Sequence, residues 1–279
     1  MKNYRLRGLF FRTFLSLVIL FFLTLTLYPI FWMVSGSLKT EAEFFSNIWG
    51  LSRNPQFGNY LEAWNRAGMG QKFLNSVLTT SFFLCILIPM NSCAGYALAR
   101  IQFKGRKLIY NYLLLGIMIP AGVLAMPTFT IVNEFGLLNT RTGLVLVYAG
   151  QAISFGMFIM RNYFISLPKS LEEAARIDGS SNFNAFIRII LPLAVPGIVT
   201  QIIFSGLANW NEYLRANLLI RSARLQTLPL GMASFANQDT IHYPVMFAAL
   251  TMATTPVVII YLMAQKTFVK GVAAGAVKG

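Results

Sequence analysis

The chain has 279 residues, of which 56% are hydrophobic and only 11% carry a charge. A soluble domain has about 25% charged residues, so this composition excludes an ordinary soluble protein. The formal net charge of +14 suggests nucleic-acid binding at first, but the basic residues follow a membrane-topology pattern instead.

The hydrophobic residues lie in six long stretches that contain no Asp, Glu, Lys or Arg. A helix needs about 20 apolar residues to cross a hydrocarbon core of about 30 Å. The shortest of the six has 19 residues, whereas the next uncharged run has 14 and is too short. The stretches are also too long, and too uniformly apolar, for barrel strands. We therefore predict an all-α integral membrane protein with six transmembrane helices. The predicted spans are 13–38, 73–99, 108–133, 142–160, 189–211 and 240–265.

The charges between these stretches predict the orientation of the chain. If the N-terminus is cytoplasmic, 15 of the 23 basic residues and three of the nine acidic residues lie inside. Basic residues favour the cytoplasmic side, so we expect both termini there. The first stretch is too long for a signal peptide and lacks a small-x-small cleavage site, which predicts a retained first span.

Three segments follow from this pattern. Residues 1–72 form the first span and an extracytoplasmic loop, with a short helix expected around 60–65. Residues 73–265 form a core of spans two to six that includes a cytoplasmic loop at 168–192. Residues 266–279 form a cytoplasmic tail.

The loop at 168–192 is predicted to begin with a short helix. Pro168 interrupts the chain after the fourth span, and Ser170 with Glu173 has the spacing of a capping box. Gly179 supplies the residue at which such a helix ends.

A second short helix is expected after Gly179, because Phe183, Phe186 and Ile187 have helical spacing. The two helices would meet at about a right angle, and Ala174 and Ala175 would give a smooth surface. Such a pair could dock into a cleft of another protein, or it could be an ordinary loop between spans. The residues alone leave both interpretations open.

The motif in this loop resembles the EAA loop of type I ABC importers. Glu-Ala-Ala-x-x-x-Gly, nine further residues and Ile-x-Leu-Pro match that loop in residue and spacing. The matching residues are Glu173, Ala174, Ala175, Gly179, Ile189, Leu191 and Pro192. The resemblance implies the type I importer permease fold, with Glu173 facing a basic residue of an ATPase subunit and Gly179 at the corner. The implied coupling residues are Ser170, Glu172, Glu173, Ala174, Ala175, Asp178, Gly179, Phe183 and Phe186.

Other short motifs resemble the carbohydrate branch of that family, and in particular the second, smaller permease of maltose-type importers. They are Ser37-Leu38-Lys39, Asn59-Tyr60, Trp210-Asn211-Glu212-Tyr213, Thr227-Leu228-Pro229-Leu230-Gly231 and the tail after Gln265. The resemblance therefore implies a bacterial or archaeal cell-membrane permease that forms half of a sugar pathway by alternating access.

The same resemblance implies the partners of the chain. They are a second homologous permease, two cytoplasmic ATPase subunits, an extracytoplasmic sugar-binding protein and membrane lipid, with no nucleic acid. The sequence contains no Gly-x-x-x-x-Gly-Lys-Ser/Thr motif, so ATP and Mg²⁺ are expected on the ATPase subunits. We expect no cofactor, metal site or catalytic residue in this chain.

Substrate contacts are predicted at Asn209, Trp210, Asn211 and Glu212, a polar cluster near the outer end of the fifth span. In the alternative interpretation, Trp210 belongs to the interfacial aromatic belt and Glu212 lies at the water boundary. A polyol phosphate or a uronate oligosaccharide is an alternative cargo. An ion-coupled secondary transporter is a further alternative, which calls for acidic pairs or broken helices at mid-membrane.

Overall fold

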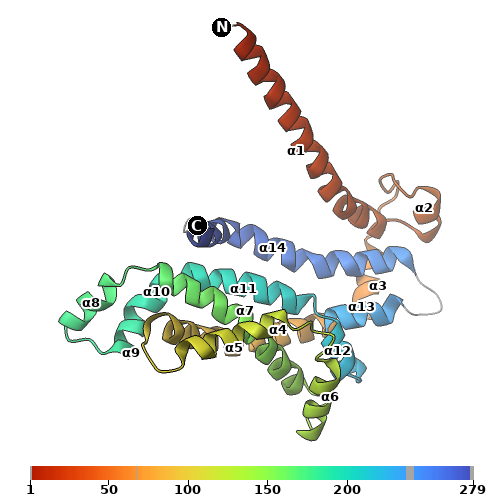
Figure 1. Ribbon diagram of the computed structural model, residues 1–279. Helices are drawn as coiled ribbons and strands as arrows, with labels where there is room; N and C mark the ends of the chain where they lie inside the picture. Colours follow the sequence, from red (N-terminus) through yellow and green to blue (C-terminus); the bar gives the residue numbers. More distant parts are fainter. Residues whose placement is uncertain (1, 67, 237–241, 277–279) are drawn as a thin grey trace. The chain divides into compact units, whose positions relative to one another are not determined.

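The computed structural model describes residues 2–66, 68–236 and 242–276, and it contains no strand in that part of the chain (Figure 1). The predicted all-α class is therefore confirmed for these residues. The chain divides into two compact units, unit 1 (1–69 and 234–254) and unit 2 (70–233 and 255–279). The longer α-helices are α1 (Lys2–Ser37), α4 (Met69–Arg100), α5 (Arg106–Met118), α6 (Ala125–Glu134), α7 (Arg141–Ser166), α11 (Val195–Trp210) and α14 (Tyr243–Ala276). The shorter ones are α2 (Glu41–Ser46), α3 (Gly58–Arg66), α8 (Ser170–Ile177), α9 (Asn182–Ala185), α10 (Leu191–Leu193), α12 (Leu214–Leu219) and α13 (Leu228–Ala236).

Four helical segments of the described residues are long and apolar enough to cross a membrane. They are Phe11–Ser37, Met69–Arg100, Arg141–Ser166 and Tyr243–Met263. A fifth candidate is a bent pair, Asn182–Leu193 with Val195–Trp210, whose two parts meet at 68°. In the order given, the four helices overlap predicted spans one, two, four and six. The bent pair overlaps predicted span five.

The predicted third span, 108–133, is not one helix. The structure has α5 with 13 residues and α6 with 10, and neither is long enough to cross a bilayer alone. The chain between them contains Pro120, and Ile119 before it is extended at ψ 118°. A proline disfavours the helical conformation of the residue that precedes it, so α5 ends there. The uncharged stretch at 108–133 does form helices, but Pro120 divides it into two.

The predicted fifth span is also interrupted, close to Pro192. A π-helix over Phe186–Ile190 precedes α10, and the N–H of Leu191 donates to the carbonyl of Phe186. Proline lacks an N–H and its ring clashes with the carbonyl four residues earlier, which favours such a widened turn. The regular helix α11 then begins only at Val195.

Unit 1 brings together two of the short motifs that resemble carbohydrate permeases, Ser37-Leu38-Lys39 and Asn59-Tyr60. The Asn59 side chain donates to the carbonyls of Ser37 and Lys39 at 2.8 and 2.9 Å. The Tyr60 hydroxyl lies 2.7 Å from the Ser37 hydroxyl. The Lys39 ammonium is fully buried and donates to the carbonyls of Asn47 and Ile48. Burial lowers the pKa of Lys39. The short helix expected around residues 60–65 is α3, so that prediction is confirmed.

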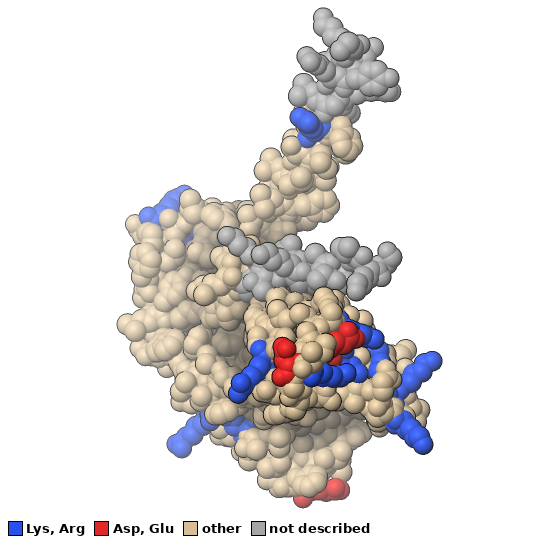
Figure 2. Space-filling model, turned by 90° about the vertical axis from the view of Figure 1, so that its left-hand side faces the viewer, with Lys and Arg blue, Asp and Glu red and all other residues tan. Residues whose placement is uncertain are grey.

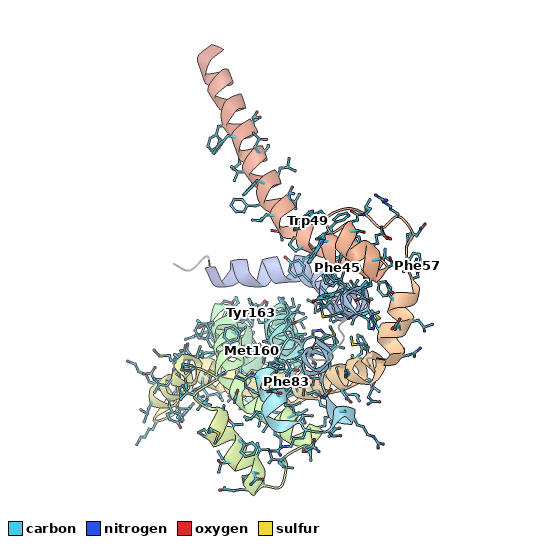
Figure 3. All side chains as sticks on the ribbon, turned by 90° about the vertical axis from the view of Figure 1, so that its right-hand side faces the viewer. Phe45, Trp49, Phe57, Phe83, Met160 and Tyr163 are labelled. Atoms are coloured by element: carbon cyan, nitrogen blue, oxygen red, sulfur yellow. The ribbon has the colours of Figure 1, made fainter. Side chains whose placement is uncertain are left out.

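Aromatic side chains also pack against one another in unit 1. Phe44 stacks on Tyr243 at 5.5 Å between ring centroids, and Trp32 meets Phe247 edge to face at 4.8 Å. Phe45 and Trp49 lie at the same aromatic cluster and are largely exposed (Figure 3). Between residues 11 and 31 of α1, every apolar side chain except Val18 is exposed, as in a helix that faces lipid.

Unit 2 is built on the packing of α4, α7 and α11. Phe83 and Met160 are buried side chains of two adjoining parts of its core (Figure 3). Gly95 of α4 lies directly against α7. A Cβ atom at this position would be 2.8 Å from the Met160 Cβ and 2.9 Å from the Arg161 backbone nitrogen. Gly95 therefore allows a close approach of α4 and α7.

Replacing Gly95 with Ala should destabilise the protein by about 1–3 kcal/mol, because the new methyl group meets backbone atoms that cannot move aside. Gly206→Ala is the matched control, since its Cβ would meet only the Leu84 side chain at an ordinary 3.6 Å. That control should be neutral or gain up to about 1 kcal/mol of helix propensity. Thermal unfolding of the two variants in detergent measures the difference. Equal stability of the two variants would show that the α4–α7 contact is loose.

Candidate functional site

The predicted docking element consists of α8 and α9, joined at Gly179. The φ angle of Gly179 is +79°, in the left-handed region that favours glycine, and α8 ends there as predicted. Ser170 does not cap α8, because Lys169 already has helical dihedral angles and Ser170 lies inside the first turn. The predicted capping box is therefore wrong. Ser181 caps α9 instead, and its hydroxyl accepts from the Asn184 N–H at 3.2 Å.

One side of the element is fastened to the rest of unit 2. The Glu172 carboxylate lies 3.0 Å from the Arg100 guanidinium, and the two side chains are 10% and 4% exposed. Arg100 is the last residue of α4, and its Nη2 also donates to the Leu167 carbonyl at 2.6 Å. Glu172, one of the implied coupling residues, therefore points into this chain. It ties α8 to the ends of α4 and α7.

The end of the second helix is fastened by Phe186, the first residue of the π-helix that follows α9. Phe186 is buried, with its ring 4.5 Å from Tyr96 and 6.2 Å from Phe164 between centroids. Ala175 is buried as well, so only Ala174 of the predicted alanine pair lies on the surface. Three of the nine predicted docking residues, Glu172, Ala175 and Phe186, thus belong to the base of the element.

The opposite side of the element is exposed. The remaining six predicted residues lie there, namely Ser170, Glu173, Ala174, Asp178, Gly179 and Phe183. Phe183 is 73% exposed and Ile177 is 87% exposed, although both are large and apolar. Ile177 was not among the predicted docking residues, although its position four residues after Glu173 places it on the same helix face. Figure 2 looks onto this end of unit 2 and shows acidic and basic side chains close together there.

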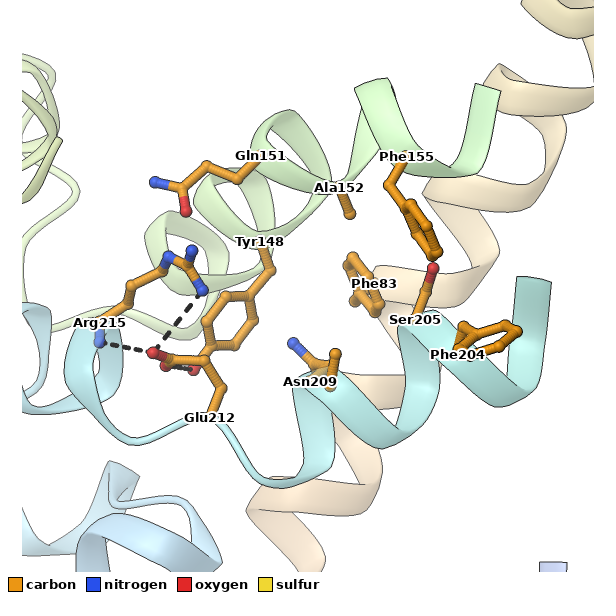
Figure 4. A pocket seen from close by; sticks show the side chains of 11 residues that line it. Phe83, Tyr148, Gln151, Ala152, Phe155, Phe204, Ser205, Asn209, Glu212 and Arg215 are labelled. Atoms are coloured by element: carbon orange, nitrogen blue, oxygen red, sulfur yellow. Dashed lines mark hydrogen bonds and ion pairs between the residues drawn. The ribbon is translucent and has the colours of Figure 1, made fainter. Parts of the chain in front are cut away.

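The four residues of the predicted substrate cluster do not all lie at one place. Asn209 and Glu212 line a cavity of about 330 Å³ between α4, α7, α11 and the start of α12 (Figure 4). Trp210 instead packs edge to face on Phe73 at 5.7 Å. Asn211 is exposed, and its amide donates to the Leu207 carbonyl at 3.0 Å.

Glu212 is the hub of a hydrogen-bond network at one end of this cavity. The Tyr148 hydroxyl donates to its Oε2 at 2.7 Å, and the N–H of Ala216 donates to the same oxygen at 3.1 Å. The N–H of Arg215 donates to Oε1 at 2.8 Å, and the Arg215 guanidinium lies 3.7 Å from that atom. Both carboxylate oxygens are occupied, so Glu212 positions its neighbours and has little capacity left for a ligand.

Comparison with known proteins places the chain among transport components. Residues 91–274 match the family model described as "Binding-protein-dependent transport system inner membrane component". The chain is 37% identical over 252 residues to the probable ABC transporter permease protein YurM of Bacillus subtilis, which covers 90% of this chain and 84% of that protein. It is 36% identical over 249 residues to the diacetylchitobiose uptake system permease protein NgcG of Streptomyces coelicolor. That match covers 88% of this chain and 82% of NgcG.

A solved structure has the same fold. It is a chain in the crystal structure of a bacterial ABC transporter involved in the import of the acidic polysaccharide alginate. That chain superposes with a TM-score of 0.83 at 24% sequence identity, over 93% of this chain and 96% of its own length. The expected permease fold is thus confirmed.

Proposed function

Because this chain belongs to the family of binding-protein-dependent transport system inner membrane components, we propose that it forms half of the translocation pathway of an ATP-driven sugar importer. The relatives support a saccharide cargo, since NgcG is named for diacetylchitobiose uptake. A second permease of the same kind supplies the other half. An extracytoplasmic binding protein delivers the sugar, and two cytoplasmic ATPase subunits bind ATP and Mg²⁺.

The proposed topology has six membrane crossings with both termini in the cytoplasm. The distribution of basic residues supports this orientation. In this topology α5 and α6 together make the third crossing, with the break at Pro120 inside the protein assembly. A broken helix is tolerated at membrane depth where neighbouring helices or a water-filled cavity satisfy its backbone.

The observation that carries the proposal is the two-sided construction of α8 and α9. One side is fixed by the buried Arg100–Glu172 ion pair, while Ile177 and Phe183 are exposed on the other side. A rigidly held element with exposed apolar side chains is suited to seating in a groove of the ATPase. Movement of that groove on ATP binding would then be passed directly to α4 and α7. Coupling further requires that the groove engage the element differently in its two states.

The docking surface is tested by replacing Phe183 with Asp. A charged residue in a desolvated interface should weaken ATPase retention about tenfold or more, measured by co-purification with the tagged permease pair. Phe135→Asp is the matched control, because Phe135 is 75% exposed and Phe183 is 73% exposed. Phe135 follows α6, outside the docking element, so the control should retain the ATPase. Retention of the ATPase by both variants would rule out docking through this surface.

The cargo is tested with the complete complex in proteoliposomes. Radiolabelled diacetylchitobiose and raffinose serve as neutral probes, and trimannuronate serves as an acidic probe. Uptake of a neutral sugar should require both ATP and the binding protein. Uptake driven by a proton or sodium gradient without ATP would overturn the proposal.

A further inference from the structure

The cavity beside Glu212 is separate from the docking element, and the side chains that line it have the composition of a ligand site. Ligand pockets measure about 300–1,000 Å³ and combine aromatic walls with a few polar groups. This cavity, at about 330 Å³, lies at the lower end of that range. Its apolar walls are the rings of Phe83, Phe155 and Phe204 together with the methyl groups of Ala152 and Ala208.

Three polar side chains at the cavity each keep a buried atom without a hydrogen-bond partner in the described part of the chain. They are the acceptor Gln151 Oε1 and the donors Asn209 Nδ2 and Arg215 Nε. Asn209 itself is only 9% exposed. Burying a polar atom without a hydrogen-bond partner costs free energy, above all in a membrane protein. A native protein therefore retains such atoms where a ligand or water supplies the missing hydrogen bond.

The Asn209 amide is oriented by the Thr80 hydroxyl, which donates to its Oδ1 at 2.8 Å and leaves its Nδ2 for a ligand. Figure 4 shows the Asn209 amide nitrogen and the Gln151 amide oxygen on the side of the space that also holds Tyr148 and Arg215. The terminal torsion of Gln is broad, so the Gln151 amide can turn toward a ligand without a change of rotamer well. Hydroxyl groups both donate and accept, and can therefore satisfy all three side chains.

The charges at the cavity favour an uncharged ligand. The only cation among the lining residues is Arg215, and its guanidinium lies 3.7 Å from Glu212. An anionic ligand would face that carboxylate as well, without a second cation to offset it. The charge pair thus disfavours a uronate or phosphate and presents hydrogen-bonding groups instead.

We propose that this cavity binds one uncharged glycosyl ring of the transported saccharide, with Gln151, Asn209 and Arg215 bonding its hydroxyls. The Phe rings cover its apolar faces, and Glu212 positions Arg215 and Tyr148. The inference rests on the proposed function and adds that this subunit itself contacts the sugar.

The first test fills the cavity with Ala152→Phe. Neutral-sugar uptake should fall at least about tenfold, because the added ring occupies the space of the glycosyl unit. Filling a mere packing defect would raise the thermal unfolding temperature and leave uptake unchanged. Wild-type uptake by a stably folded Ala152→Phe complex would therefore overturn the proposal.

The second test does not depend on how Ala152→Phe folds. Asn209→Leu removes one hydrogen-bonding amide from the cavity, whereas Asn211→Leu makes the same change two residues away on an exposed side chain. The sugar concentration for half-maximal uptake should rise about tenfold in the first variant and less than about twofold in the second. Equal values for the two variants would contradict the subsite.

The outcomes separate this inference from the function on which it rests. If the wild-type complex imports no saccharide with ATP, the proposed function fails before any variant is compared. If it imports neutral sugars and the cavity variants behave as wild type, only the subsite fails. Preference of the wild type for trimannuronate over both neutral probes would overturn the assignment to an uncharged ring.

Discussion

Replacing Glu172 with Ala is expected to destabilise the protein by about 3–5 kcal/mol, because it leaves the Arg100 guanidinium buried without its counter-charge. The Arg100 side chain is 4% exposed, so solvent cannot replace the lost carboxylate. Its remaining bond, to the Leu167 carbonyl, neutralises no charge. Chemical or thermal unfolding of the purified permease pair measures the loss.

A double variant provides the control for this prediction. In Arg100→Met with Glu172→Leu, both charges are replaced by apolar side chains of similar size, and stability should recover most of the loss. Glu173→Ala is the second control, because Glu173 is exposed and such surface changes stay within about 0.5 kcal/mol. A loss below about 1 kcal/mol for Glu172→Ala would show that the pair is more hydrated than its burial indicates.

The contrast between Glu172 and Glu173 shows what the sequence could and could not predict. The motif and its spacing located α8, its end at Gly179 and the short helix that follows. They did not distinguish the buried Glu172 from the exposed Glu173, because that distinction depends on which side chain each carboxylate contacts. The partner of Glu172 is Arg100, 72 positions earlier in the chain, and only the packing of α8 against α4 brings them together.

The predicted membrane spans likewise show what the sequence could and could not predict. Uncharged length predicted where apolar helices lie, and the four long helical segments confirm it. Length does not show a local break of the backbone, so length alone predicts continuous helices over 108–133 and 189–211. The prolines in these stretches, Pro120 and Pro192, indicate where the helices break. At the cavity, Asn209 and Glu212 were found through their polarity. Tyr148, Gln151 and Arg215 were missed because they come from other segments of the chain.

Replacing Glu173 with Lys should abolish most coupling between ATP hydrolysis and transport while leaving the folded subunit intact. The Glu173 carboxylate is exposed on α8 and makes no hydrogen bond or ion pair within the described residues. In the proposed complex it faces a basic group of the ATPase, so reversal of its charge replaces attraction by repulsion. Substrate-stimulated ATP hydrolysis by the reconstituted complex should fall about tenfold or more. Thermal stability of the isolated permease pair should change by less than about 0.5 kcal/mol.

Graded substitutions at this position separate an electrostatic contact from a purely steric one. Glu173→Gln keeps the size of the side chain and removes its charge, so its loss of coupling should be intermediate between wild type and Glu173→Lys. The defect of the Lys variant should also shrink as salt is raised, since exposed charges are screened over about 8–10 Å at 0.10–0.15 M ionic strength. Glu172→Ala should show the reverse pattern, with reduced stability in the isolated permease pair before any ATPase is added. Wild-type stimulated hydrolysis in Glu173→Lys would place the contact between the ATPase and α8 on other residues, with Ile177 the first to test.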